Sequence, residues 1–104
     1  MNIEQIMMVE MEGLSQTIKQ YSNDNYIISY ANQLSSIKYP DDSVKFCLLI
    51  NRLYEWYVKE IDKIKKSEYI LAKDSHFKSF EIISELKSIL DSRGIVKWMS
   101  IYIR

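Results

Sequence analysis

The longest stretch with one unbroken helical repeat of hydrophobic side chains covers residues 43–66. Its apolar positions recur at steps of three and four residues, which places them on one face of an α-helix. These positions are Phe46, Ile50, Leu53, Tyr57, Ile61 and Ile64, and Leu49 widens the face on one flank. The pattern predicts a central helix that is roughly 36 Å long, enough to span a small domain from end to end.

The amino-terminal part of the chain predicts two helices separated by a polar turn. The first covers roughly residues 2–22, although Gly13 inside it costs about 1 kcal/mol relative to alanine. The second covers residues 26–37, after a cluster of turn-forming residues in which Asp24 is a candidate N-cap. Residues 26–30 alone are also compatible with a strand, but no second strand is available to pair with them. The expected core positions are Ile3, Ile6, Met7, Leu14, Ile18, Tyr21, Ile27, Tyr30 or Ala31, Leu34 and Ile37.

Pro40 marks the clearest boundary, because the residue before a proline is pushed out of helical geometry. Acidic and hydroxyl residues at 41–43 can cap the central helix that follows, and Lys65 and Lys66 place cations at its negative end.

A fourth helix is predicted after the connector 68–73. Asp74 or Ser75 can cap its start, and Arg93 with Gly94 is typical of its end. Its core positions are Phe77, Phe80, Ile82 or Ile83, Leu86, Ile89 and Leu90. Residues 95–104 are too apolar to remain a free tail, so they either pack back on the helices or contact a partner. Their periodicity does not decide between helical and extended structure.

These segments predict an all-α fold, a single domain over residues 1–104 that forms an antiparallel four-helix bundle with a short carboxyl-terminal segment. A chain of 104 residues can bury one core, and its 47% hydrophobic and 27% charged residues are ordinary for a globular protein. Two glycines and one proline favour helices with few tight turns.

We expect a cytoplasmic location, because the sequence has neither a run of about twenty apolar residues nor a basic start followed by an apolar core. The single cysteine, Cys47, excludes an internal disulfide. Its apolar neighbours in sequence predict a buried structural thiol rather than a nucleophile.

The formal net charge is zero, so nucleic acid is not an expected partner. The charge is unevenly distributed: residues 1–42 hold two lysines and six acidic residues, whereas residues 43–104 hold twelve basic and eight acidic residues. Residues 93–104 contain three basic residues and no acidic one. This asymmetry either helps the two halves pack together or provides a basic tail for an acidic or membrane-proximal partner.

Residues with catalytic chemistry are sparse, and we expect no enzymatic activity. His76, the only histidine, is predicted to lie on the surface near the start of the fourth helix. It has no cluster of cysteine, histidine or aspartate at metal-ligand spacing around it, and two glycines do not make a phosphate-binding loop. No metal, cofactor or small-molecule substrate is therefore expected.

Aromatic side chains are abundant: eight tyrosines, two tryptophans and three phenylalanines. Tyrosine and tryptophan combine a large contact area with a polar group, which suits binding surfaces. The simpler alternative is that a small helical core uses them inside.

The string Leu49-Ile50-Asn51-Arg52-Leu53 within the third predicted helix resembles the immunity proteins of pediocin-like (class IIa) bacteriocins, of the enterocin A immunity type. The chain length, the order of four helices and the break before a carboxyl-terminal segment are similar as well. The absence of a strongly basic overall charge and the end of the chain at Arg104 depart from that family.

The resemblance implies a non-catalytic cytoplasmic bundle that protects a producer cell from its own bacteriocin by acting at the receptor, a mannose permease. Because the carboxyl-terminal half of such proteins tends to set specificity, it implies these partner-binding residues: Arg93, Lys97, Trp98, Tyr102 and Arg104. Asn51 and Arg52 are interpreted as polar residues of the bundle surface. The alternatives are a small helical adaptor, chaperone or inhibitor, and a DNA-associated regulator.

Overall fold

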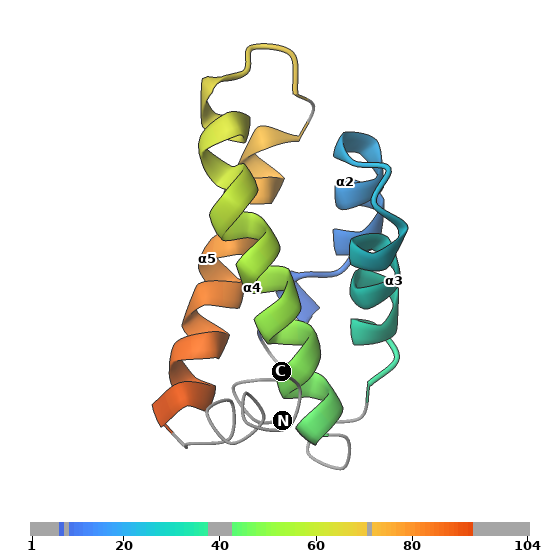
Figure 1. The fold of residues 1–104 in the computed structure, drawn as a ribbon, viewed down its shortest axis with the longest axis vertical. Helices are drawn as coiled ribbons and strands as arrows, with labels where there is room; N and C mark the ends of the chain where they lie inside the picture. Colours follow the sequence, from blue (N-terminus) through green and yellow to red (C-terminus); the bar gives the residue numbers. More distant parts are fainter. Residues whose placement is uncertain (1–6, 8, 38–42, 71, 93–104) are drawn as a thin grey trace.

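A computed structural model of the chain describes residues 7, 9–37, 43–70 and 72–92. These residues contain four helices, α2 (Leu14–Tyr21), α3 (Asn25–Leu34), α4 (Ser43–Lys66) and α5 (Lys73–Ser92). The helices run alternately up and down (Figure 1). The predicted all-α, antiparallel four-helix fold is therefore confirmed for the described residues, and the carboxyl-terminal segment lies outside them.

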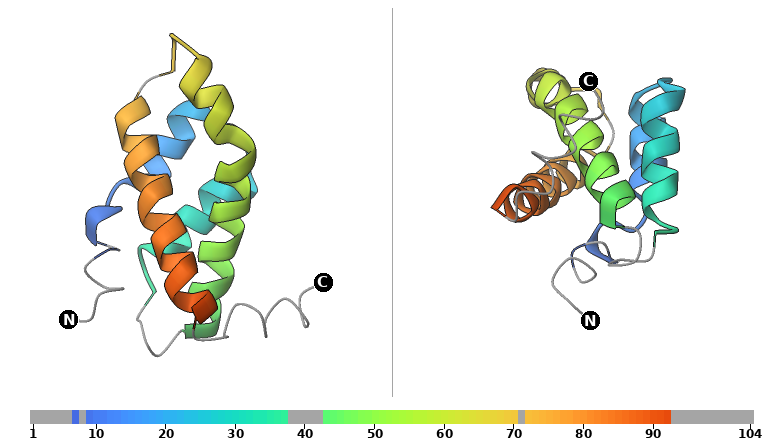
Figure 2. Two further views of the ribbon diagram at one scale, coloured as in Figure 1. Left: turned by 90° about the vertical axis from the view of Figure 1, so that its left-hand side faces the viewer. Right: turned by 60° about the horizontal axis from the view of Figure 1, so that its bottom comes forward.

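Each helix packs against its neighbours in sequence, and α2 closes the arrangement by packing against α5. The two further views show the long α4–α5 pair on one side and the shorter α2–α3 pair on the other (Figure 2). None of the helices in the described ranges is both long enough and apolar enough to cross a membrane.

Helix α4 begins and ends where the hydrophobic repeat predicts, at Ser43 and Lys66. All positions predicted for its core face are buried, and so is Cys47, as its sequence context predicted. The amino group of Lys73 donates to the main-chain oxygen of Lys65 at 2.9 Å, which satisfies one of the carbonyl groups exposed at the end of α4.

The prediction of one continuous helix over residues 2–22 is wrong. Met7, Val9 and Glu10 are helical, but residues 11–13 form a turn before α2 starts. The cause is Gly13, which adopts a left-handed conformation with φ of 86°. Glycine reaches this conformation without steric cost, so the chain can change direction here while Met7 and Met11 remain buried.

Asp24 caps α3, as predicted. One oxygen of its carboxylate accepts hydrogen bonds from the main-chain amides of Tyr26 at 3.0 Å and Ile27 at 3.4 Å. The helix ends at Leu34, three residues before the predicted end. The hydroxyl groups of Ser35 and Ser36 donate to main-chain oxygens of the last turn at 2.7 and 3.0 Å, and such local bonds compete with continuation of a helix.

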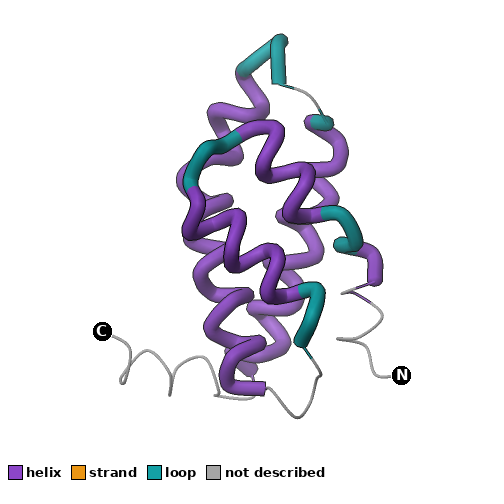
Figure 3. Tube along the Cα trace, turned by 90° about the vertical axis from the view of Figure 1, so that its right-hand side faces the viewer, coloured by secondary structure: helices purple, strands orange, loops and turns teal. Residues whose placement is uncertain are grey.

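Helix α5 starts one residue before the predicted cap. Asp74 and Ser75 lie inside its first turn, and the preceding Ala72 adopts a left-handed conformation with φ of 57°. In the trace of Figure 3 the described loop residues between α2 and α3 form a short connection.

The two left-handed residues predict opposite effects on stability. Gly13→Ala should destabilise the protein by about 1 kcal/mol, because an alanine resists positive φ. A Cβ atom at this position meets nothing within 4 Å, so the loss comes from the backbone alone. Ala72→Gly should stabilise it by about 0.5 kcal/mol, because strain relief exceeds the added entropy of the unfolded chain. Urea unfolding measures both, and equal signs for the two changes would contradict the observed conformations.

The cap of α3 predicts that Asp24→Ala destabilises the protein by about 1 kcal/mol, because two amides lose their acceptor. Asp24→Asn is the matched control and should retain most of the stability, since its side-chain oxygen still accepts these bonds. The midpoint of thermal unfolding measures both variants. A loss of the same size for the asparagine variant would assign the effect to charge rather than to capping.

Candidate functional site

His76 is buried, and the prediction that it lies on the surface is wrong. It is fully enclosed in the first turns of α5. Positions 76, 79, 83, 86 and 90 follow one another at helical steps of three and four, and all of them are buried. The periodicity of the fourth helix was therefore the signal that places His76 on the core face.

The imidazole of His76 has one hydrogen-bond partner among the described residues. Its Nδ1 atom lies 3.0 Å from the hydroxyl oxygen of Tyr57 on α4. Its Nε2 atom is buried and has no partner in the described part of the chain. A neutral imidazole carries a proton on one nitrogen and a lone pair on the other, so in either tautomer one polar atom is left unsatisfied.

Aromatic rings surround this pair. The Tyr21 and Tyr57 rings approach the imidazole edge-on, with centroid distances of 5.5 and 5.9 Å. Trp56 packs against both tyrosines at 5.8 and 4.9 Å, and Phe80 lies 5.8 Å from Tyr57. We call Tyr21, Trp56, Tyr57, His76 and Phe80 the aromatic cluster. It joins α2, α4 and α5.

Burial determines the ionisation of the central pair. It lowers the pKa of His76 below the ordinary value of 6.5, because the charged imidazolium loses its hydration. It also raises the pKa of Tyr57 well above 10, although a side-chain hydrogen bond to Ser79 acts in the opposite direction. Both groups are therefore neutral at pH 7.

A second polar contact ties α2 to α4 at the edge of the aromatic cluster. The hydroxyl group of Tyr21 donates to Oε2 of Glu60 at 2.7 Å, and Oε1 of Glu60 lies 3.7 Å from the amino group of Lys63. Burial, this hydrogen bond and the negative charge of Glu60 raise the pKa of Tyr21 to about 12.

His76 and Tyr57 form a buried polar contact between α4 and α5. A general base must reach a proton of the substrate, whereas His76 is enclosed and already bonded to Tyr57. The described residues contain no group of three or more histidine, cysteine, aspartate or glutamate side chains that could hold a metal ion.

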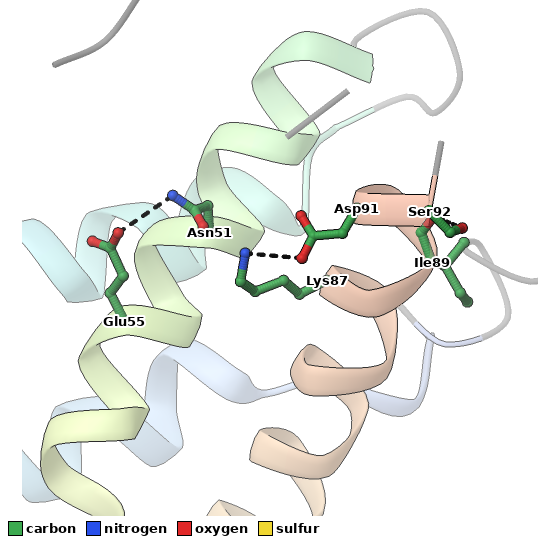
Figure 4. Close-up of polar contacts among 6 residues, drawn as sticks. All are labelled: Asn51, Glu55, Lys87, Ile89, Asp91 and Ser92. Atoms are coloured by element: carbon green, nitrogen blue, oxygen red, sulfur yellow. Dashed lines mark hydrogen bonds and ion pairs between the residues drawn. The ribbon is translucent and has the colours of Figure 1, made fainter. Parts of the chain in front are cut away.

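Asn51 and Arg52, the polar residues of the resemblance string, are half-buried on the surface of α4 and contact the same side chain. Nδ2 of Asn51 lies 3.5 Å from Glu55, and the guanidinium group of Arg52 lies 3.9 Å from it. On the neighbouring helix Lys87 pairs with Asp91 at 3.3 Å (Figure 4). Lys87 also lies over the Tyr54 ring, 5.3 Å from its centre. The hydrogen bonds and ion pairs of these residues form within each helix, and the contact of Lys87 with the Tyr54 ring joins α5 to α4.

The partner-binding residues predicted from the resemblance all lie outside the described residues: Arg93, Lys97, Trp98, Tyr102 and Arg104. Their prediction stays a prediction. The residues that the structure brings together form the aromatic cluster instead, and sequence reasoning missed His76 as its buried polar member.

Comparison of the chain with models of known protein families, with curated proteins and with solved structures finds no significant match.

The Tyr57–His76 pair predicts that Tyr57→Phe destabilises the protein by about 2 kcal/mol, because it leaves Nδ1 as well as Nε2 of a buried imidazole without a partner. Tyr21→Phe should cost about 1 kcal/mol, since Tyr21 and Glu60 are only half-buried and water can replace the lost contact. Urea unfolding at pH 7.5 measures the two losses.

Tyr26→Phe is the control for these two variants, because Tyr26 is 76% exposed. Its effect should stay within about 0.5 kcal/mol. A loss for Tyr57→Phe no larger than this control would show that the buried hydrogen bond contributes nothing to stability.

Proposed function

We propose that this protein is a non-catalytic binding protein of the bacteriocin immunity type, acting from the cytoplasmic side at a membrane receptor of the mannose permease kind. The observation that carries the proposal is the position of the resemblance string in the third helix of an antiparallel four-helix bundle. This is the element order that the resemblance implies.

The division of the string between core and surface supports the same proposal. Leu49, Ile50 and Leu53 are buried, whereas Asn51 and Arg52 lie at the surface. The apolar members of the string therefore contribute to the core of the bundle. In our proposal the specific binding surface comes from elsewhere in the chain.

The bundle provides a scaffold for a binding segment at the carboxyl-terminal end. Helix α5 precedes residues 93–104 in the sequence and packs along α4. Its side chains Ile83, Leu86 and Leu90 are fully buried. In our proposal Arg93, Lys97, Trp98, Tyr102 and Arg104 contact the partner. Tryptophan, tyrosine and arginine are the residues that most often dominate the affinity of protein interfaces.

A protection assay tests this proposal. The full chain is expressed in a strain sensitive to pediocin-like bacteriocins, and survival is measured against a panel of these peptides. We expect protection against at least one of them, and its loss when the chain is truncated after Gly94. Trp98→Ala should weaken binding of the receptor complex by roughly thirty-fold, as the removal of a central aromatic contact does.

Lys59→Ala is the matched control, because Lys59 lies on the exposed face of α4 and should leave protection unchanged. Circular dichroism of every variant confirms that the helices still form. Full-length protein that folds but protects against no member of the panel would contradict the immunity proposal and leave a helical adaptor or inhibitor as the function to test.

A further inference from the structure

His76 is an isolated titratable group in the range between pH 5.5 and 7.5. It is the only histidine of the chain, and no other side-chain type ordinarily titrates there. Its imidazole is completely enclosed, and Nε2 has no partner in the described residues. A proton added to this ring places a positive charge and an unsatisfied N–H group in an apolar environment.

The position of His76 makes the charge still less favourable. His76 is the fourth residue of α5, and its main-chain amide donates to the oxygen of Ala72 at 3.1 Å in the first turn. The amino-terminal end of a helix carries a partial positive charge, which repels an imidazolium group. The same turn follows a strained left-handed alanine and a connection in which Tyr69 is 89% exposed. The start of α5 therefore adjoins an exposed connection and holds the buried imidazole in its first turn.

We propose that the Tyr57–His76 pair is a proton-sensitive latch that holds the first turns of α5 against α2 and α4. At neutral pH the imidazole is uncharged and stays in the aromatic cluster. In mild acid the open form binds a proton on His76, and the first turns of α5 separate from the bundle. Opening exposes Trp56, Tyr57 and Phe80 to solvent.

The groups around the imidazole favour this outcome. Tyr21 from α2 and Tyr57 from α4 are neutral and titrate only in alkali. Glu60 from α4 is the acidic group that contacts the cluster, through Tyr21. Its carboxylate already accepts a hydrogen bond from the Tyr21 hydroxyl group and forms an ion pair with Lys63. On α5 itself Asp74 is exposed, and the amino group of Lys73 is bonded to the oxygen of Lys65. None of these groups provides a buried anion bonded to the imidazole.

The direction of the pH dependence follows from proton linkage. The closed form binds a proton more weakly than the open form, in which His76 has its ordinary affinity. The closed form is therefore fully favoured above pH 6.5 and loses its advantage as the pH falls. The equilibrium constant for opening should rise by about tenfold for each pH unit below 6.5, until the closed form also accepts the proton.

Trp56 is the natural reporter of opening, because its ring contacts both Tyr21 and Tyr57. The experiment uses the full chain with Trp98→Phe, so that Trp56 is the only tryptophan. Its fluorescence is followed from pH 7.5 to 5.5, together with amide hydrogen exchange. We expect exchange to accelerate for residues 73–80 by about tenfold per pH unit below 6.5 after correction for the intrinsic rate, while the amides of residues 53–61 in α4 change little.

Three variants distinguish protonation of His76 from other effects of acid on the protein. His76→Asn keeps a hydrogen-bonding group near Tyr57 without a titration in this range, and its corrected exchange should be independent of pH. His76→Phe replaces the ring by an apolar one and should behave in the same way. Asp74→Asn removes the carboxylate two residues before His76 on α5 and should retain the response of the unmodified protein.

Nuclear magnetic resonance of the His76 ring in the unmodified chain gives a direct test that does not depend on a variant folding. We expect the ring of the closed form to remain neutral below pH 6.5. Titration at or above 6.5 without accelerated exchange would overturn the proposal. So would an equal response in His76→Asn, or a simultaneous acceleration of all core amides, which indicates global unfolding.

Discussion

The continuous buried face of α4 is the constraint on which the rest of the structure depends. Phe46, Ile50, Leu53, Tyr57 and Ile64 are fully enclosed along its length, and enclosing them requires cover from both sides. Helices α3 and α5 provide this cover, and α2 closes the bundle between them. Burial of a single side chain of this size stabilises a fold by about 2 kcal/mol, so the face dominates the choice of architecture.

Tyrosine side chains bring polar groups into this core, because each carries a hydroxyl group at the end of an apolar ring. Tyr57 contributes an apolar ring to the face of α4 and a hydroxyl group to His76. Tyr21 does the same between α2 and Glu60. The two contacts join α2, α4 and α5. They differ in burial, because Glu60 remains in contact with solvent while Nε2 of His76 is enclosed without a partner in the described residues.

The scaffold and the segment proposed to bind a partner have separate roles in this arrangement. Leu86 and Leu90 hold α5 in the bundle up to its last turns, and its exposed face carries the local Lys87–Asp91 pair. The resemblance string lies within α4, where its apolar members pack in the core. The aromatic cluster lies near the start of α5, whereas residues 93–104 follow the end of this helix. A conformational change in the cluster therefore acts at the other end of α5.

The sequence by itself determined the helices that have a strong and uninterrupted hydrophobic repeat. The bounds of α4, its buried face, the enclosure of Cys47 and the Asp24 cap could all be predicted, because they depend on side chains close together in sequence. The hydrophobic repeat did not mark where the weaker helices begin and end, because local backbone features set these bounds. Gly13 and Ala72 are left-handed, and Ser35 and Ser36 bond to the last turn of α3. Only the tertiary structure decided the partner of His76, because the Tyr57 hydroxyl group lies nineteen residues away on another helix. A polar side chain is stable in a core only where such a partner meets it, and packing between helices brings the two together.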